Sequence, residues 1–298
     1  MNANSEPKLF FVINPGAGAD DNAWQDIISA YFAGRTPIPV FHLLDKKPNL
    51  EKLKKNIAEA KPDRIIAVGG DGTVTMVAKL IAGTKTALGI LPAGSANGMA
   101  KELNIPFEPT AALKVIETGE IKSCDMIGIN GNESCLHLSD IGLNAQLIKH
   151  FDEGKIRGKL GYARVVIKTL LRKRKMQVCI QGKSTEIKTE ALMIVLANAS
   201  KYGTGAVINP DGKLDDGLFE IVVVKKLSVR YLLKVLFNIR HSDPKDLEIF
   251  HAKTAQIDTM KSMHFQIDGE YKGKLKHINA KILPGHINLI LPATGKHD

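Results

Sequence analysis

The sequence predicts an α/β domain with a mostly parallel sheet, followed by a second domain that is rich in antiparallel β-structure. Strand-like apolar runs alternate with helix-like segments in the first part, and three glycine-containing turns each follow a strand. Beyond residue 125, short strand-like runs are separated by turn residues. The 298 residues suffice for two domains of ~100–200 residues each. We place these domains at residues 1–121 and 122–298, and leave open whether the tail returns to the first domain.

The first domain alternates strands and helices from its beginning. Alternation of this kind is typical of a parallel sheet with helices on both faces. Ligands of such sheets bind beyond the carboxyl ends of the strands, so the glycine turns should gather at one edge. The strands are expected at residues 9–13, 38–44, 64–68 and 87–91, and helices at residues 22–32, 49–60, 74–81 and after the last strand.

The second domain lacks this alternation. Its strand-like runs are short and bounded by turn residues, which favours antiparallel pairing. Two helical stretches, 161–172 and 229–239, interrupt the pattern. The strands are expected at residues 134–138, 177–181, 190–197, 218–224, 255–257, 264–267 and 287–291.

The composition excludes several classes of protein. Hydrophobic residues make up 44% of the chain and charged residues 24%, which is typical of a globular protein. The three cysteines lack paired spacing, which argues for a reducing compartment and against a disulfide scaffold or zinc site. Neither a signal peptide nor an apolar run of the ~20 residues that span a bilayer is present. We therefore expect a cytoplasmic protein that touches membranes only peripherally.

The turn at residues 69–73, with the sequence GGDGT, carries the strongest single signal. It follows one expected strand and opens a helix. Glycines let the backbone approach an anion closely, and the N–H groups of a helix start point at it. A carboxylate at Asp71 would repel a bare phosphate, so its presence indicates a metal ion or a hydroxyl proton as its partner.

Two weaker turns, at residues 14–18 and 91–97, also follow strands. Ser95 and Asn97 offer side-chain groups at a helix start, where they suit either capping or anion binding. No G-x-G-x-x-G, Walker loop or H-E-x-x-H motif is present, and Gly182-Lys183-Ser184 is interpreted as a hairpin turn. A histidine-bound metal is therefore not expected.

Two acidic turns lie in the second domain. Residues 211–217, with the sequence DGKLDDG, suit either Mg²⁺ or Ca²⁺ binding or a solvated turn. Residues 268–270, with the sequence DGE, suit either a hairpin turn or a catalytic acid pair. Neither turn decides between its alternatives by itself.

Taken in order, these segments resemble the diacylglycerol kinase catalytic-domain family, which includes bacterial lipid kinases and the sphingosine kinases. The resemblance spans nearly the whole chain. It implies a nucleotide-binding α/β domain and a C-terminal β-sandwich, with ATP and lipid meeting in the cleft between them. The implied reaction transfers the γ-phosphoryl group of ATP to a hydroxyl of diacylglycerol or a related lipid, as in phospholipid synthesis. The matching segments are Asn14-Pro15 with Gly18, and residues 69–73, 91–97, 198–205, 210–217 and 268–270.

The resemblance also implies roles for individual residues. Asp71 is placed near the phosphates and the metal, and Asp268 and Glu270 form the acidic pair that accepts the hydroxyl proton. Glu270 is favoured as the base, with Asp268 as its competitor. An Mg²⁺ site is implied at Asp216 with the backbone carbonyls of Lys213 and Leu218. The nucleotide is expected to be held by Asn14, Pro15, Gly16, Gly18, Gly69, Gly70, Gly72, Thr73, Ser95 and Asn97.

The sequence departs from the family pattern at two positions. Bacterial diacylglycerol kinases usually read G-T-x-N-D after the second loop, whereas Gly98 stands here in place of that aspartate. Asn144 occupies a position where an aspartate is common. Both positions are expected near the acceptor, so they leave the identity of the lipid open.

The surplus of 41 Lys and Arg over 31 Asp and Glu gives a net charge of +10, which predicts an anionic partner. The basic apolar segment 155–175 suits either an anionic membrane surface or a packed helix. A nucleic-acid partner is not expected, since aromatic residues are only 5% and no reader motif is present. Phosphorylation of a soluble acceptor, as in NAD kinases, and a non-catalytic nucleotide- or membrane-binding module remain alternatives. Whether the chain forms a homodimer is open.

Overall fold

The computed structural model describes residues 6–16, 23–152, 175–183, 186–199, 201–202, 206–207, 212–226 and 247–293. Contacts divide the chain into two compact units, Met1–Cys124 with Gly285–Asp298, and Asp125–Pro284. Two strands, β5 (Glu120–Ile129) and β16 (Glu270–Leu291), contribute residues to both units. Within these ranges, no helix combines the length and apolarity that crossing a membrane requires.

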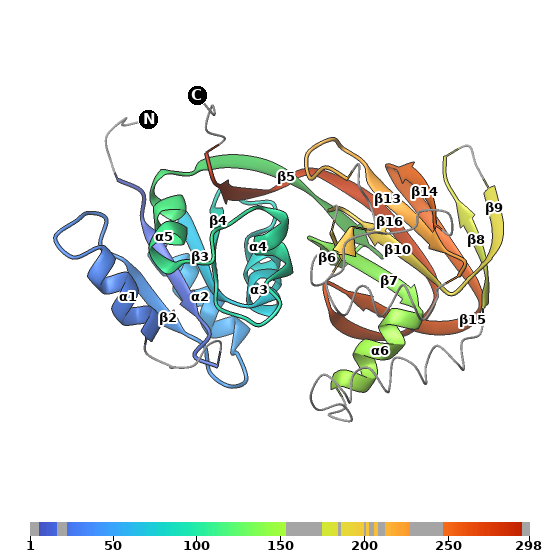
Figure 1. The fold of residues 1–298 in the computed structure, drawn as a ribbon, viewed down its shortest axis with the longest axis horizontal. Coiled ribbons are helices and arrows are strands. Elements are labelled where there is room, and N and C mark those ends of the chain that lie inside the picture. The colour runs from blue at the N-terminus through green and yellow to red at the C-terminus, as the bar shows by residue number, and fades with distance from the viewer. Residues whose placement is uncertain are drawn as a thin grey trace. The chain divides into compact units, whose positions relative to one another are not determined.

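The first unit is built on a parallel sheet, as the sequence predicts. Its strands lie in the order β2-β1-β3-β4, and Asn288 and Leu289 of β16 pair in parallel with β4 (Figure 1). Strands β1 and β4 are buried along their whole length, as expected for a sheet covered on both faces. The four strands are β1 (Leu9–Ile13), β2 (Val40–Leu43), β3 (Arg64–Gly69) and β4 (Ala87–Pro92).

Helices cover both faces of this sheet (Figure 1). The Phe11 ring of β1 lies 6.1 Å from the Phe32 ring that follows α1. The neighbouring Phe10 stacks at 6.2 Å on His42, whose Nδ1 lies 2.9 Å from Asn56 Nδ2 of α2. Because adjacent strand residues point to opposite faces, α1 and α2 lie on opposite sides. The helices are α1 (Ala23–Tyr31), α2 (Leu50–Ala60), α3 (Asp71–Ile81), α4 (Gly98–Glu102) and α5 (Pro109–Thr118).

The second unit is a β-sandwich, which confirms the predicted β-rich fold. One layer runs β14-β13-β10-β7 and the end of β15, with antiparallel pairing throughout. The start of β15 pairs instead with β8, while β16 pairs with both the start and the end of β15. Register shifts between Asp258 and Met263 bend β15 from one layer into the other, as β-bulges commonly do. The strands are β6 (Glu133–Cys135), β7 (Leu138–Gly142), β8 (Met176–Gln181), β9 (Glu186–Ala191), β10 (Met193–Ala197), β13 (Phe219–Val224), β14 (Leu247–Ala252) and β15 (Thr254–Ile267). A separate two-stranded pair joins β11 (Lys201–Tyr202) and β12 (Ala206–Val207).

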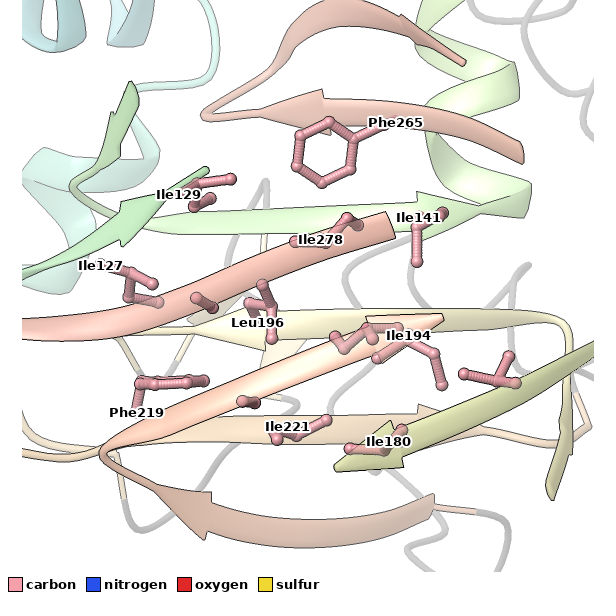
Figure 2. Packing of buried hydrophobic residues seen from close by; sticks show 14 of the residues in the cluster. Ile127, Ile129, Ile141, Ile180, Ile194, Leu196, Phe219, Ile221, Phe265 and Ile278 are labelled. Atoms are coloured by element: carbon pink, nitrogen blue, oxygen red, sulfur yellow. The ribbon is translucent and has the colours of Figure 1, made fainter. Parts of the chain in front are cut away.

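The core of the sandwich lies between the two layers. Figure 2 shows Phe219, Ile194 and Leu196 of the first layer among Ile180 and Ile278 of the second. The outer face of the first layer carries a smaller apolar cluster that includes Leu143 and Leu147 of α6 (Leu143–Asp152). Helix α6 therefore covers the face of β7, β10 and β13 that points away from the main core.

Several element boundaries differ from the sequence prediction. The expected strand 190–197 is two strands that meet at Leu192. The expected strands 255–257 and 264–267 are one bent strand, β15, because apolar alternation is lost where the strand bulges. Strand 134–138 is split between β6 and β7, and the run 287–291 is only the end of β16. The expected helices 161–172 and 229–239 lie outside the described residues.

Candidate functional site

Three loops meet the carboxyl edge of the sheet in the first unit, after β1, β3 and β4. The chain leaves β1 for β2 on one side and leaves β3 for β4 on the other. Such a reversal opens a crevice at the strand ends, where doubly wound sheets bind ligands. The N–H of Asn14 donates to the carbonyl of Val68 (3.0 Å), and Asn14 Nδ2 donates to Thr73 Oγ1 (3.3 Å). These bonds join the first loop to the second.

The second and third loops touch through their glycines. A Cβ added to Gly94 would lie 2.4 Å from the Cα of Gly70, which is closer than real Cβ contacts allow. The N–H of Ala93 also donates to the carbonyl of Gly69 at 3.0 Å. This approach therefore requires glycine at position 94. A Cβ at Gly70 would lie 3.3 Å from the Gly94 Cα, which is a tight contact.

Gly72 has a different environment. It is exposed in the first turn of α3, and no atom lies within 4 Å of the Cβ that a larger residue would carry. Packing within the described protein therefore does not require glycine here. A ligand that approaches the backbone would require it, since the first N–H groups of a helix have no partner in the helix itself and attract anions.

Asp71 has a structural partner that the sequence does not reveal. Its Oδ2 accepts the N–H of Gly98 and its Oδ1 accepts the N–H of Met99, both at 2.9 Å. These are the first residues of α4, so Asp71 caps that helix from the start of α3. The position of Gly98, where an aspartate is usual, is thus part of a contact between two helix starts.

The other residues predicted to bind the nucleotide differ in whether their polar groups are already hydrogen-bonded within the loops. Asn97 adopts a positive φ of 50° and holds its own loop, accepting from the Gly94 N–H (2.9 Å) and donating to the Gly94 carbonyl (2.7 Å). The Gly16 N–H donates to Asn14 Oδ1 at 3.2 Å. Ser95 is exposed and Pro15 half-buried, while Gly18 lies outside the described residues.

In the second unit, Asp268 and Gly269 form the turn between β15 and β16. Both have positive φ, 49° and 85°, and Ile267 pairs with Glu270 across them, as in a type I′ hairpin. The Asp268 carboxylate accepts the N–H groups of Leu136 (2.9 Å), His137 (2.8 Å) and Leu138 (3.1 Å) and the thiol of Cys135 (3.3 Å). Asp268 is therefore engaged in holding the segment between β6 and β7.

Glu270, the other member of the predicted pair, faces solvent. Its side chain is 47% exposed and lies 3.2 Å from Lys272 Nζ, which also contacts Glu133 at 3.1 Å. Burial lowers the pKa of the Lys272 ammonium, but its hydrogen bonds to Glu133 and Glu270 outweigh this effect and raise the pKa overall. The ammonium is therefore charged at neutral pH. Of the two acids, Glu270 is the more exposed.

The predicted metal loop is ordered by a buried acid that the sequence prediction missed. Asp125 is only 3% exposed. Its Oδ2 accepts the N–H of Gly217 (2.7 Å), and its own N–H donates to the carbonyl of Leu214 (2.6 Å). Asp216 is exposed, and its Oδ1 accepts the N–H of Leu218 at 3.0 Å. The one available signal was a charged residue inside the apolar run 124–129.

Asn198 links this loop to the hairpin turn. Its fully buried Nδ2 donates to the carbonyls of Asp125 and Leu136, both at 2.8 Å. Leu136 in turn donates its N–H to Asp268. Because both partners of Nδ2 are acceptors, the amide orientation is determined, and the buried Asn198 Oδ1 has no hydrogen-bond partner among the described residues. The sequence pattern included Asn198 in a motif without indicating this role.

These oxygen atoms are chemically suited to a hard cation. Asp216 and the carbonyls of Lys213 and Leu218 would supply three oxygens, and Mg²⁺ usually keeps several waters. Asn198, whose Oδ1 has no partner in the described part of the chain, is hydrogen-bonded to Asp125, which anchors the same loop. Among the described residues, no three His, Cys, Asp or Glu side chains are grouped to hold a metal. The proposed donors would hold an ion mainly through backbone carbonyls and water.

Comparison with known proteins covers both units. Residues 8–129 match the family model of the diacylglycerol kinase catalytic domain. Residues 139–291 match that of the YegS C-terminal NAD kinase beta sandwich-like domain.

Individual relatives agree with the family models. A "Probable lipid kinase YegS-like" protein of Serratia proteamaculans (strain 568) is 30% identical over 238 residues, 76% of each chain. One of the same name from Yersinia pestis (strain Pestoides F) is 29% identical over 237 residues, 76% of this chain and 78% of the relative. The solved structure of a "putative diacylglycerol kinase" from Bacillus anthracis str. Sterne superposes with a TM-score of 0.79 at 26% identity, covering 96% of this chain and 97% of that one.

The two glycine environments predict opposite outcomes for the same substitution. Gly94→Ala should destabilise the protein by about 1–3 kcal/mol, because its Cβ would overlap the second loop. Gly72→Ala should leave stability unchanged or raise it by up to about 1 kcal/mol, since alanine favours helix and has room. Thermal unfolding of both variants checks this. A Gly94→Ala protein as stable as the wild type would contradict the loop contact.

Proposed function

The chain belongs to the YegS-like lipid kinases, whose N-terminal part is a diacylglycerol kinase catalytic domain, and from this we propose that it transfers the γ-phosphoryl group of ATP to a hydroxyl of diacylglycerol or a related lipid. The observation that carries the proposal is the hairpin at residues 268–270. There one acid is fixed by backbone N–H groups and the next, Glu270, is exposed beside a lysine. A base on a rigid turn is what an acceptor hydroxyl requires.

We propose that the three loops of the first unit bind the triphosphate. Support comes from their position at the carboxyl edge of the sheet and from the open space at Gly72. Phosphoryl transfer needs positioning and neutralisation of charge more than covalent chemistry. Backbone N–H groups at the start of α3 would supply fixed dipoles for this purpose. The contact between Gly70 and Gly94 would keep two of the loops in register.

Glu270 is proposed as the general base. The lipid oxygen forms a bond to the γ-phosphorus while the bond from that phosphorus to the β–γ bridging oxygen breaks, and ADP leaves. Glu270 accepts the hydroxyl proton as this happens. Asp268 is less suited, because its carboxylate already accepts three backbone N–H groups and a thiol. Its role is to hold the turn.

We propose that Mg²⁺ is held by Asp216 with the carbonyls of Lys213 and Leu218. When bound, the ion would supply positive charge to a loop otherwise rich in acids. Asp125 and Asn198 support the loop from the interior, and Asn198 connects it through Leu136 to Asp268. The loop and the hairpin are therefore parts of one hydrogen-bonded framework within the second unit.

A lipid acceptor also implies peripheral contact with an anionic membrane, which we include in the proposal. The net charge of +10 supports it. The basic segment 155–175 is the candidate, although residues 153–174 lie outside the described part.

The reaction is tested by incubating the protein with labelled ATP, Mg²⁺ and a panel of acceptors. Diacylglycerol and sphingosine in mixed micelles represent lipids, and NAD represents a soluble acceptor. We expect label in a lipid product and none in NAD. Labelling of NAD alone would favour a soluble-acceptor kinase, and labelling of no acceptor together with ATP binding would favour a non-catalytic module. Both results would contradict the proposal.

The metal assignment predicts a change in Mg²⁺ dependence. Asp216→Ala should raise the Mg²⁺ concentration needed for half-maximal activity by about tenfold or more, because the loop loses its only proposed carboxylate ligand. Mg²⁺ should also raise the unfolding temperature of the wild type but not of this variant. Asp215→Ala, one residue away, is the matched control. Equal Mg²⁺ dependence in the wild type and in Asp216→Ala would contradict the assignment of Mg²⁺ to this loop.

A further inference from the structure

A buried polar cluster lies where β7, α6 and the end of β15 meet. Asp140 is 1% exposed and Gln266 is completely buried. A buried charge is costly unless hydrogen-bond donors surround it. Asp140 and Gln266 therefore need hydrogen-bond partners inside the sandwich, and one of these partners belongs to the hairpin turn.

The Asp140 carboxylate holds the start of α6 and the side chain of Gln266. Its Oδ1 accepts the N–H of Ala145 at 2.9 Å. Its Oδ2 accepts Asn144 Nδ2 at 2.6 Å and Gln266 Nε2 at 2.5 Å. Together these three donors occupy both oxygens of the carboxyl group. The carboxylate therefore fixes the Gln266 amide from one end.

The other end of the same amide holds the turn. Gln266 Oε1 accepts the N–H of Gly269 at 2.7 Å. Only one orientation of the amide places Nε2 on a carboxylate and Oε1 on an N–H group. The backbone of Gln266 is held as well, since its carbonyl accepts Ser139 Oγ at 2.7 Å. The side chain thus has one conformation that satisfies both partners.

We propose that Gln266 is a positioning residue for Glu270. Gly269 is the second turn residue, with φ of 85°, and its peptide leads directly into Glu270. Asp268 anchors the first residue of the turn to β7, and Gln266 anchors the second to Asp140. With both peptides held, the chain enters β16 in one direction. The backbone of Glu270, from which its carboxylate extends, is therefore fixed in position. The proposal rests on the proposed role of Glu270 as base.

The cluster also changes the interpretation of Asn144. The sequence places Asn144 near the acceptor, where it would bear on lipid identity. In the structure its amide is a donor to Asp140. An aspartate at this position would set a second carboxylate against the first. Asn144 therefore belongs to the support of the turn.

Two variants of Gln266 test the proposal. Gln266→Met keeps the length of the side chain and removes both hydrogen bonds. Gln266→Glu keeps an acceptor for Gly269 but replaces the donor to Asp140 with a second carboxylate. The control is Gln256→Glu on the same strand, because the exposed Gln256 also donates to an aspartate, Asp258, at 2.9 Å. Each protein is examined by amide hydrogen exchange at Gly269 and by phosphoryl-transfer kinetics.

We expect Gln266→Met to exchange the Gly269 amide faster than the wild type, because it removes the acceptor of the Gly269 N–H. Gln266→Glu should also exchange it faster, because loss of the donor to Asp140 releases the side chain that holds that acceptor in place. Their kcat should fall about tenfold or more, because small displacements of a reacting group are costly, while the KM for ATP changes less than about twofold. Gln256→Glu should match the wild type in both measurements. If one Gln266 variant does not fold, the other still tests the proposal.

Unchanged exchange at Gly269 in a folded Gln266 variant would overturn the link to the turn. Faster exchange with unchanged kcat would overturn the positioning role. If the wild type transfers no phosphate to any acceptor, the proposed function fails by itself, and exchange at Gly269 still decides whether Gln266 holds the turn.

Discussion

The second unit depends on one interaction, the carboxylate of Asp268 receiving the backbone N–H groups of residues 136–138. Residues 136 and 137 form the bend between β6 and β7, and Leu138 is the first residue of β7. A buried donor left without a partner costs about 1–3 kcal/mol. Asp268 satisfies all three from the tip of the hairpin. The same contact that completes the sheet therefore fixes the turn on which Glu270 stands.

Two further side chains connect this contact to other parts of the unit. Asn198 hydrogen-bonds both Leu136 and Asp125, and Asp125 anchors the loop proposed to bind Mg²⁺. Gln266 hydrogen-bonds both Gly269 and Asp140, and Asp140 in turn accepts an N–H group at the start of α6. Acids thus serve as anchors at Asp125, Asp140 and Asp268, and Asp71 does the same for α4 in the first unit. We propose chemical roles only for two exposed acids, Asp216 and Glu270.

The sequence predicted those strands and turns that depend on a local pattern of residues. Apolar runs followed by glycine turns indicated the parallel strands. A hairpin turn was one of the two alternatives for Asp268-Gly269, and the positive φ values show that turn. It could not predict partners distant in the chain. Asp268 and His137 are 131 residues apart, and Asp125 and Gly217 are 92 apart. Nothing in the local sequence shows that Asp268 binds backbone N–H groups and that Glu270 is exposed, so the sequence left the two acids as competitors for the proposed base.

Asp268 is assigned a structural role and Glu270 the role of base. The most direct test of these two roles measures turnover and unfolding free energy together for Asp268→Asn and Glu270→Gln. Asp268→Asn should lose about 1–3 kcal/mol of stability, because an amide nitrogen would face backbone N–H groups. Glu270→Gln should keep its stability and lose about 10²–10⁴-fold in turnover, while Glu133→Gln, which shares Lys272 with it, should retain activity. Wild-type turnover in Glu270→Gln, with full stability but no turnover in Asp268→Asn, would exchange the two roles and contradict the account.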